Sequence, residues 1–323
     1  MTSAPDICPW GAVSIDVDTL YSLFGEAYTG GGEIIYGRAM PRFFEMLDEL
    51  GIRATLFVVG QDLARSEAAR RVIRNAAGMG HEIGNHTEHH IQGLCYLEPL
   101  QQRREIIEAH RRIEDVTGAP VVGFRAPGWN IGPSTFDILE EEGYGYDSSM
   151  MPSVANPALK LMHWLSTRRG DALQRRTLGS LLHTLAPAGP YRPGHRPWRR
   201  GNRAIIEIPV SVTPGCRFPF FGTFHLLAGE WTYRLTAPLL RRSSRPANYE
   251  LHAVEFCDSE ADGARAAIEG VDGLYVPPTL AMALPRKRAF LRQALGNMHS
   301  WRPLGPIRQL ADWWAPRLPM ASP

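Results

Sequence analysis

Strand patterns and helix patterns alternate along the first half of the chain, and this alternation limits the fold more than any other feature. Short apolar runs typical of buried strands are followed by stretches whose apolar residues recur with helical spacing. The expected strands cover residues 12–18, 54–59, 81–84, 121–124 and 144–149, and the expected helices cover residues 38–50, 66–77, 97–117 and 133–142. This order is typical of a parallel α/β sheet, which we expect to close into a barrel.

The alternation stops between about residues 153 and 203, where ten Lys and Arg residues occur with Asp171 as the only acidic residue. Two interpretations remain open. The stretch can be a solvated basic insertion, or a surface for phosphate or an anionic membrane, where each basic residue contributes roughly 1 kcal/mol. The later elements are expected at residues 204–212, 249–254, 285–296 and 305–315. We expect one domain over residues 1–323, with an insertion at about 153–203 and a C-terminal helical extension at about 285–316.

Composition excludes several classes of protein. The formal net charge of +2 gives no basic surplus for nucleic acid. The four cysteines are scattered without a Cys-x-x-Cys pair, so a reduced, cytosolic protein is expected. The chain does not open with a basic segment followed by an apolar core, and no uncharged apolar run reaches transmembrane length. We expect a cytoplasmic protein, with peripheral contact with the inner face of the membrane if the basic insertion binds lipid.

A histidine pair, His86 and His90, gives the strongest indication of chemistry. Residues four apart lie on one face of a helical turn, so both imidazoles can point to one metal ion. The pair follows the expected strand at 81–84, and α/β proteins place functional residues at the C-terminal ends of strands. A solvated histidine-rich turn is the alternative. A second pair, Asp16 and Asp18, ends the first strand on one side, which is costly unless a cation or a proton separates the two carboxylates.

Five motifs, taken in chain order, resemble those of the NodB-homology polysaccharide deacetylases, the family 4 carbohydrate esterases. They are Asp16-Val-Asp18, His86-Thr-Glu-His-His90, Arg125-Ala-Pro-Gly-Trp129, Tyr146-Asp-Ser-Ser149 and Leu251-His252. The resemblance covers roughly residues 12–256 and is greatest to the branch that includes the undecaprenyl-phosphate aminoarabinose deformylase. It implies a distorted (β/α) barrel of the NodB type, and hydrolysis of N-acetyl or N-formyl groups from amino sugars.

The resemblance implies a metal site and a general base. Asp18, His86 and His90 would bind a divalent metal, with zinc preferred and cobalt, nickel or iron as alternatives. Asp16 would take the proton of the attacking water, and Arg125 would keep this carboxylate ionised. The family usually has two adjacent aspartates, whereas this chain spreads them to Asp16-x-Asp18.

The resemblance also implies the groups that meet the leaving amine and the oxyanion. His252 would be the acid that protonates the amine. The backbone N–H near Gly128 would stabilise the oxyanion, with Trp129 and Asp147 beside the substrate. The family often has a tyrosine where this chain has Gly128, and Asp147 matches the fourth motif only loosely. Arg125 could alternatively close a strand end with Asp147.

Other histidines compete for these roles. Without the resemblance, His252 would be read as a core histidine bonded to backbone. His225 competes for the acid role, but its apolar loop favours packing. His81 and His89 are close to the ligand motif in sequence, and we expect both to surround the ligands rather than bind the metal.

The function that these patterns favour is metal-dependent removal of an N-acetyl group from an amino sugar, carried on a lipid or in another small glycoconjugate. The basic, aromatic insertion and the apolar loop at residues 218–224 favour the lipid-linked substrate. A deformylase, or another C–N amide hydrolase acting on a non-polysaccharide substrate, is the alternative. A non-catalytic carbohydrate-binding relative is disfavoured because every expected ligand and the base are present.

Overall fold

A computed structural model describes residues 8–19, 34–159, 161, 180–265 and 278–319. Its core is a curled parallel sheet with the order β6-β5-β4-β3-β2-β1-β7, and β8 pairs with β1 beside this path. The strands are β1 (Gly11–Val17), β2 (Thr55–Val58), β3 (Glu82–Asn85), β4 (Gly123–Phe124), β5 (Tyr146–Asp147), β6 (Ile206–Glu207), β7 (Asn248–His252) and β8 (Leu304–Gly305). The expected distorted (β/α) barrel is confirmed.

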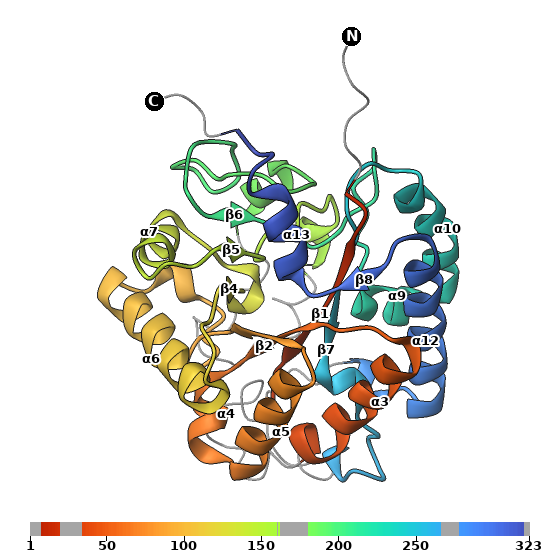
Figure 1. Cartoon of the computed structure of the whole chain (residues 1–323). Helices are drawn as coiled ribbons and strands as arrows, with labels where there is room; N and C mark the ends of the chain where they lie inside the picture. The colour runs from red at the N-terminus through yellow and green to blue at the C-terminus, as the bar shows by residue number, and fades with distance from the viewer. Residues whose placement is uncertain (1–7, 20–33, 160, 162–179, 266–277, 320–323) are drawn as a thin grey trace.

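All but the last of the helices surround the sheet on its outer face, and the last one covers an end of the barrel (Figure 1). They are α3 (Met40–Leu50), α4 (Gly60–Arg65), α5 (Glu67–Gly78), α6 (Pro99–Thr117), α7 (Pro133–Glu141), α9 (Gly222–Ala228), α10 (Glu230–Arg241), α12 (Leu284–Trp301) and α13 (Ile307–Trp314). Shorter helical turns occur at Ile35–Ala39, Leu94–Tyr96, Pro127–Trp129, Leu181–Leu185, Ala253–Phe256 and Pro278–Ala281. None of the helices in the described part of the chain is long and apolar enough to span a membrane.

The interior of the barrel is closed by α13. Its residues Ile307 and Leu310 pack in one buried cluster with Ala12 of β1, Phe57 of β2 and Tyr146 of β5. The backbone N–H of Ile307 also donates to the Thr55 hydroxyl at the start of β2, over 2.8 Å. Because the strands are parallel and α13 meets their N-terminal ends, the opposite, C-terminal ends remain available for a site.

The sequence patterns overestimated the strands that follow residue 120. The expected strands 144–149 and 204–212 contain strands of only two residues each, β5 and β6, and Val212 adds an isolated bridge to Pro219. The expected basic insertion is described only in part, because residues 160 and 162–179 lie outside the described ranges. In its described portion, residues 180–203 form a turn and short bridges, with Tyr191 pairing with Glu207 of β6.

Gly84 in β3 shows how tightly the barrel interior packs beneath the strand ends. A Cβ at this position would lie 2.7 Å from the Phe57 ring, and the Arg125 guanidinium lies 4.3 Å from the centre of that ring. We expect Gly84→Ala to lower the free energy of unfolding by about 1–3 kcal/mol through overpacking. Gly78→Ala in α5 is the control, because its Cβ would meet nothing within 4 Å. Denaturant unfolding of both variants tests this, and equal stability would contradict it.

Candidate active site

A carboxylate and two imidazoles converge at the C-terminal ends of β1 and β3. Asp18 follows β1, and its Oδ1 lies 3.4 Å from Nε2 of His86 and 3.2 Å from Nε2 of His90. All three side chains are buried, and their potential ligand atoms lie within 4.8 Å of one another. The structure therefore brings together the three residues that the sequence proposed as metal ligands.

Hydrogen bonding at His86 prepares its Nε2 for a metal. Nδ1 of His86 lies 2.7 Å from the carbonyl oxygen of Arg125, which can only accept, so Nδ1 must carry the proton. In the neutral ring, Nε2 then presents its lone pair toward Asp18. A carbonyl behind the coordinating ring is the usual partner of a metal-binding histidine.

The Asp18 carboxylate supplies the test of whether a metal fits. Its Oδ1 is buried and accepts no hydrogen bond in the described part of the chain. A buried anionic oxygen without a donor is costly, and a cation between it and the two ring nitrogens removes this cost. Two imidazoles and one carboxylate are also a common donor set for zinc and related divalent metals. The residues present fit such an ion.

The two histidines lie on a tight loop rather than on the helical turn that the sequence pattern suggested. Thr87 and His90 have positive φ angles of 67° and 54°, which is uncommon for residues other than glycine. The loop is held by Asn85, whose Oδ1 accepts from the Thr87 N–H over 2.7 Å, and by the Thr87 hydroxyl, which accepts from the His90 N–H. These bonds stabilise the strained backbone that turns both rings toward Asp18.

Asp16 and Arg125 form a buried ion pair beside the metal ligands. Nη1 of Arg125 donates to Oδ1 of Asp16 over 2.6 Å, and its Nε and Nη2 donate to the carbonyl and hydroxyl of Ser148. Burial alone would raise the pKa of Asp16, but the positive charges of Arg125 and His86 lower it below the usual value. The carboxylate is therefore kept ionised, as a general base requires. The alternative pairing of Arg125 with Asp147 is wrong, because Arg125 bonds to Ser148 instead.

Glu250 is a member of this site that the sequence reasoning missed. It is fully buried in β7, and its Oε1 accepts from the Trp129 indole over 3.2 Å and lies 3.5 Å from Nη1 of Arg125. Burial raises the pKa of Glu250 to about 8, and the charge of Asp16 adds to this while Arg125 opposes it. A signal was available, because Glu250 and His252 are two apart on one strand and so face the same side.

His252 lies next to Asp16 through the register of the sheet, since the two residues are partners across β1 and β7. Its side chain is 24% exposed, and its Nδ1 is 3.0 Å from the Thr223 hydroxyl. Burial would lower the pKa of His252, but Glu255, Glu250 and Asp16 raise it to about 10. His252 is thus a cation at neutral pH. It faces carboxylates rather than backbone, unlike a typical core histidine.

The Arg125 to Trp129 segment turns sharply above β4. Gly128 and Trp129 both have positive φ angles, 60° and 53°. The Trp129 ring packs edge-on against Phe221, with ring centroids 5.7 Å apart. Apolar and aromatic surface therefore lies next to Glu250 at this position.

Asp147 lies behind this segment and is buried. Its carboxylate accepts from the N–H and the hydroxyl of Ser149, and the same hydroxyl accepts from the Ala126 N–H over 2.8 Å. The neighbouring carboxyl of Glu207, buried with Asp147, has a pKa raised well above its usual value by burial and by Asp147. These contacts indicate that Asp147 positions the turn that carries Gly128.

Three further histidines have partners other than the candidate metal ligands. His225 is buried and packs against the Tyr249 ring, and burial lowers its pKa to about 3, as expected for a core residue. His89 pairs with Glu105 through a 2.7 Å bond from its Nδ1. The expectation that His81 lies around the ligands is wrong, because it precedes β3 and accepts from the Ala54 N–H at the opposite end of the strands.

Comparisons with known proteins place part of the chain beside one family. A family model described as polysaccharide deacetylase matches residues 20–146, a range that includes His86, His90 and Arg125. A peptidoglycan deacetylase-like protein of Gibberella zeae is 30% identical over 150 residues, which are 43% of this chain and 43% of the relative. The peptidoglycan deacetylase of Helicobacter pylori is 26% identical over 118 residues, 36% of this chain and 39% of the relative. The matches thus span less than half the length of these two curated relatives.

Solved structures share the fold over nearly the whole chain. A protein from Mycobacterium smegmatis with a provisional polysaccharide deacetylase description superposes with a TM-score of 0.62 and 20% identity, covering 99% of this chain and 96% of that one. A PuuE allantoinase superposes with a TM-score of 0.54 and 15% identity, covering 96% and 92%. At these identities the likeness concerns the fold.

Proposed function

We propose that this chain, for which the comparisons support the polysaccharide deacetylase family, is a metal-dependent hydrolase that removes an N-acetyl group from an amino sugar. One observation carries the proposal. The Asp18 oxygen that accepts no hydrogen bond faces two imidazole nitrogens, and the Asp16–Arg125 pair lies beside them with His252, the partner of Asp16 across β1 and β7. Amide hydrolysis requires a base and an acid beside one metal position, and these contacts support such an arrangement.

Each residue then has a distinct task. Asp18, His86 and His90 would hold a divalent metal, which when bound supplies Lewis acidity and lowers the pKa of the attacking water. Asp16, kept ionised by Arg125, takes the proton of this water. His252 donates a proton to the nitrogen of the leaving amine, which departs poorly as an anion. The turn at Gly128 is the place where a backbone N–H can stabilise the oxyanion.

The substrate that we propose is an acetylated amino sugar carried on a lipid or in a small glycoconjugate. Support comes from the aromatic surface formed by Trp129 and Phe221 next to Glu250. The names of the relatives concern peptidoglycan, so a glycan chain is the reference substrate in any assay. Contact of the basic insertion with an anionic membrane remains a prediction, as does a cytoplasmic location.

The experiment is a measurement of metal content and acyl release with the purified protein. We expect near-stoichiometric divalent metal, and acetate release from N-acetylglucosamine oligomers or peptidoglycan fragments that stops with chelator and returns with zinc or cobalt. Formate release from N-formylated sugars, with acetyl sugars untouched, would overturn the acetyl assignment. A protein that binds no metal after reconstitution would overturn the hydrolase proposal as a whole.

We expect Glu250→Gln to lower the upper pH limit of activity. Glu250 is ionised above about pH 8, and its charge then helps His252 to keep its proton up to a pKa of about 10. A raised pKa means that the acid form is present below this value and is lost as the pH rises through it. Without the charge, the loss of activity moves to lower pH.

Two measurements check this expectation, namely the pH–rate profile and the NMR titration of the His252 ring. Trp129→Phe is the matched control, because it removes the indole bond to Glu250 without changing any charge. The alkaline limit should stay in place in this control. An unchanged His252 titration in Glu250→Gln would contradict the assignment whether or not a substrate is known.

A further inference from the structure

Helix α10 exposes a surface that the proposed function does not use. Its outward positions hold only apolar and basic residues, namely Trp231, Arg234, Leu235, Pro238, Leu239 and Arg241, followed by Arg242. Trp231, Leu235 and Leu239 recur every four residues and are 62%, 64% and 42% exposed. Large apolar side chains exposed in a row are unusual on a soluble helix and mark an interaction surface. These seven residues are called the α10 face.

The inner side of α10 packs tightly against the rest of the protein, so the exposed row does not result from a loosely packed helix. Tyr233 is buried, and its hydroxyl donates to the carbonyl of Ala294 and contacts the side chain of Asn297 over 2.9 Å each. Its ring also meets Phe290 of α12. The helix thus has one face fixed to α12 and the opposite face turned outward (Figure 1).

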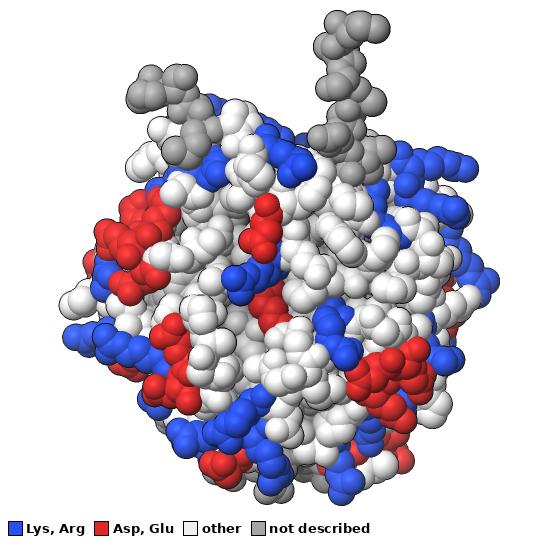
Figure 2. Space-filling model, viewed as in Figure 1, with Lys and Arg blue, Asp and Glu red and all other residues white. Residues whose placement is uncertain are grey.

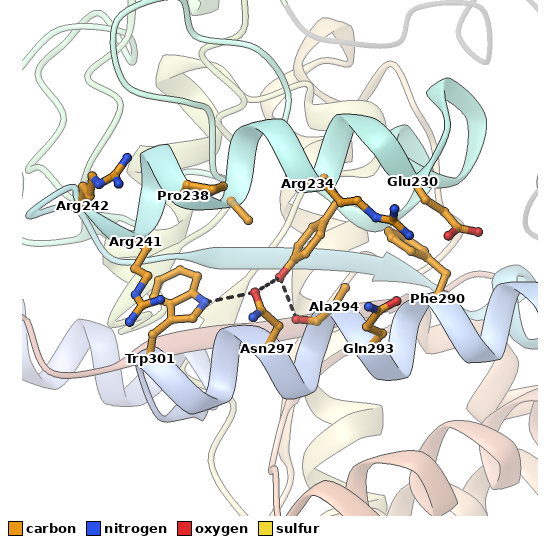
Figure 3. A pocket seen from close by; sticks show the side chains of 12 residues that line it. Glu230, Arg234, Pro238, Arg241, Arg242, Phe290, Gln293, Ala294, Asn297 and Trp301 are labelled. Atoms are coloured by element: carbon orange, nitrogen blue, oxygen red, sulfur yellow. Dashed lines mark hydrogen bonds between the residues drawn. The ribbon is translucent and has the colours of Figure 1, made fainter.

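A groove of about 690 Å³ runs between α10 and α12 beside this face (Figure 3). Arg234, Arg241 and Arg242 line it together with Trp301, whose indole contacts Asn297. The one acidic residue of the lining, Glu230, lies 3.6 Å from Arg286. The groove therefore offers guanidinium groups and an indole to an anionic group.

We propose that the α10 face docks the protein on an anionic lipid surface. The aromatic and leucine side chains of the row would enter the boundary between headgroups and acyl chains, and the arginines would meet lipid phosphates. Figure 2 shows basic side chains gathered over α10 at the right edge of the molecule, with a group of acidic side chains lower on that side. The acidic residue of α10 itself, Glu230, lies 3.6 Å from Arg286. A second copy of the chain fits this face less well, because a two-fold contact would bring the arginines of both copies together.

The face is connected to the active site through α9. Thr223 at the start of α9 contacts His252, and Gly229 alone separates the end of α9 from α10. Docking would therefore hold the site near the lipid surface. The inference goes beyond the proposed function, since it needs neither a metal nor catalysis.

Flotation with vesicles tests the inference, using phosphatidylcholine alone or mixed with phosphatidylglycerol. We expect recovery only with the anionic vesicles, decreasing with salt. Trp231→Ser/Leu235→Ser and Arg241→Ser/Arg242→Ser should each lower binding at least about tenfold. The controls Leu100→Ser and Arg111→Ser change equally exposed positions of α6, on the other side of the barrel, and should bind like the wild type.

Three results would overturn the inference: no recovery of the wild type, equal recovery with neutral vesicles, or recovery that both α10 variants retain. Sedimentation tests whether a second copy of the chain occupies the face instead. A wild-type dimer that Trp231→Ser/Leu235→Ser disrupts, together with no flotation, would assign the face to that second copy. The same variants should hydrolyse a soluble acetylated sugar at the wild-type rate. Failure of docking and failure of the proposed hydrolysis are thus measured separately.

Discussion

Asp18→Asn and His86→Ala are expected to purify without bound metal and to lose deacetylation at least about a thousandfold, because the metal contributes several kcal/mol to the transition state. The geometry explains why both should fail. Oδ1 of Asp18 is the point on which both imidazoles converge, at 3.4 and 3.2 Å. Loss of either partner leaves two ligands, too few to hold the ion against water.

Stability should respond differently from activity in these variants. Asp18→Asn removes a buried anionic oxygen without a hydrogen-bond donor, so the metal-free variant should unfold no more easily than the metal-free wild type. Metal analysis, acetate release and thermal unfolding in chelator give the three readouts. His89→Ala is the matched control, because this histidine pairs with Glu105 and should leave metal content unchanged. Full metal content in Asp18→Asn would refute the ligand assignment.

Arg125→Met is expected to produce the largest loss of stability, about 3–5 kcal/mol, because it leaves buried carboxylates without their cation. Arg125 is fully buried, donates to Asp16 over 2.6 Å and lies 3.5 Å from Glu250. It also fixes Ser148 through two further hydrogen bonds. Activity should fall as well, because the pKa of Asp16 rises once the guanidinium is gone.

A double variant separates the electrostatic part of this loss from the packing part. Arg125→Met/Asp16→Asn removes the cation together with its main anion, so we expect it to regain part of the stability and none of the activity. Chemical denaturation measures the first effect and acetate release the second. If the double variant is as unstable as Arg125→Met alone, the loss comes from the bonds to Ser148 rather than from unpaired charge.

The sequence supported the fold and the metal ligands for reasons that are local. Buried parallel strands such as β2 are continuous apolar runs. Asp16 and Asp18 lie at the end of β1, His86 directly follows β3, and His90 lies in the loop beyond it. The register of the sheet then brings residues of different strands together, since Asp16 lies opposite His252 and Asn85 lies opposite Phe124. A residue that follows a parallel strand can therefore be assigned to the site from its position in the chain.

Features that depend on packing could not be read in this way. The strained loop at Thr87 and His90 has no sequence signature, because neither residue is glycine. Glu250 shares a face of β7 with His252, but its contacts with Trp129 and Arg125 come from other segments and appear only in the folded chain. The strand at β6 was overestimated because apolar residues continue past Glu207 into irregular, buried chain. The residues that follow β5, Ser148 and Ser149, are buried but bond to Arg125 and Asp147 through their side chains.

The closure of the barrel by α13 has a consequence for synthesis of the protein. The first strand pairs with β8, where Gly11 lies opposite Leu304, and the interior beneath it is filled by Ile307 and Leu310. Nearly three hundred residues must therefore leave the ribosome before β1 can pair with β8. Contacts so distant in sequence form slowly. The nascent barrel will present an open apolar end throughout elongation, which is the stage at which a chaperone would be needed.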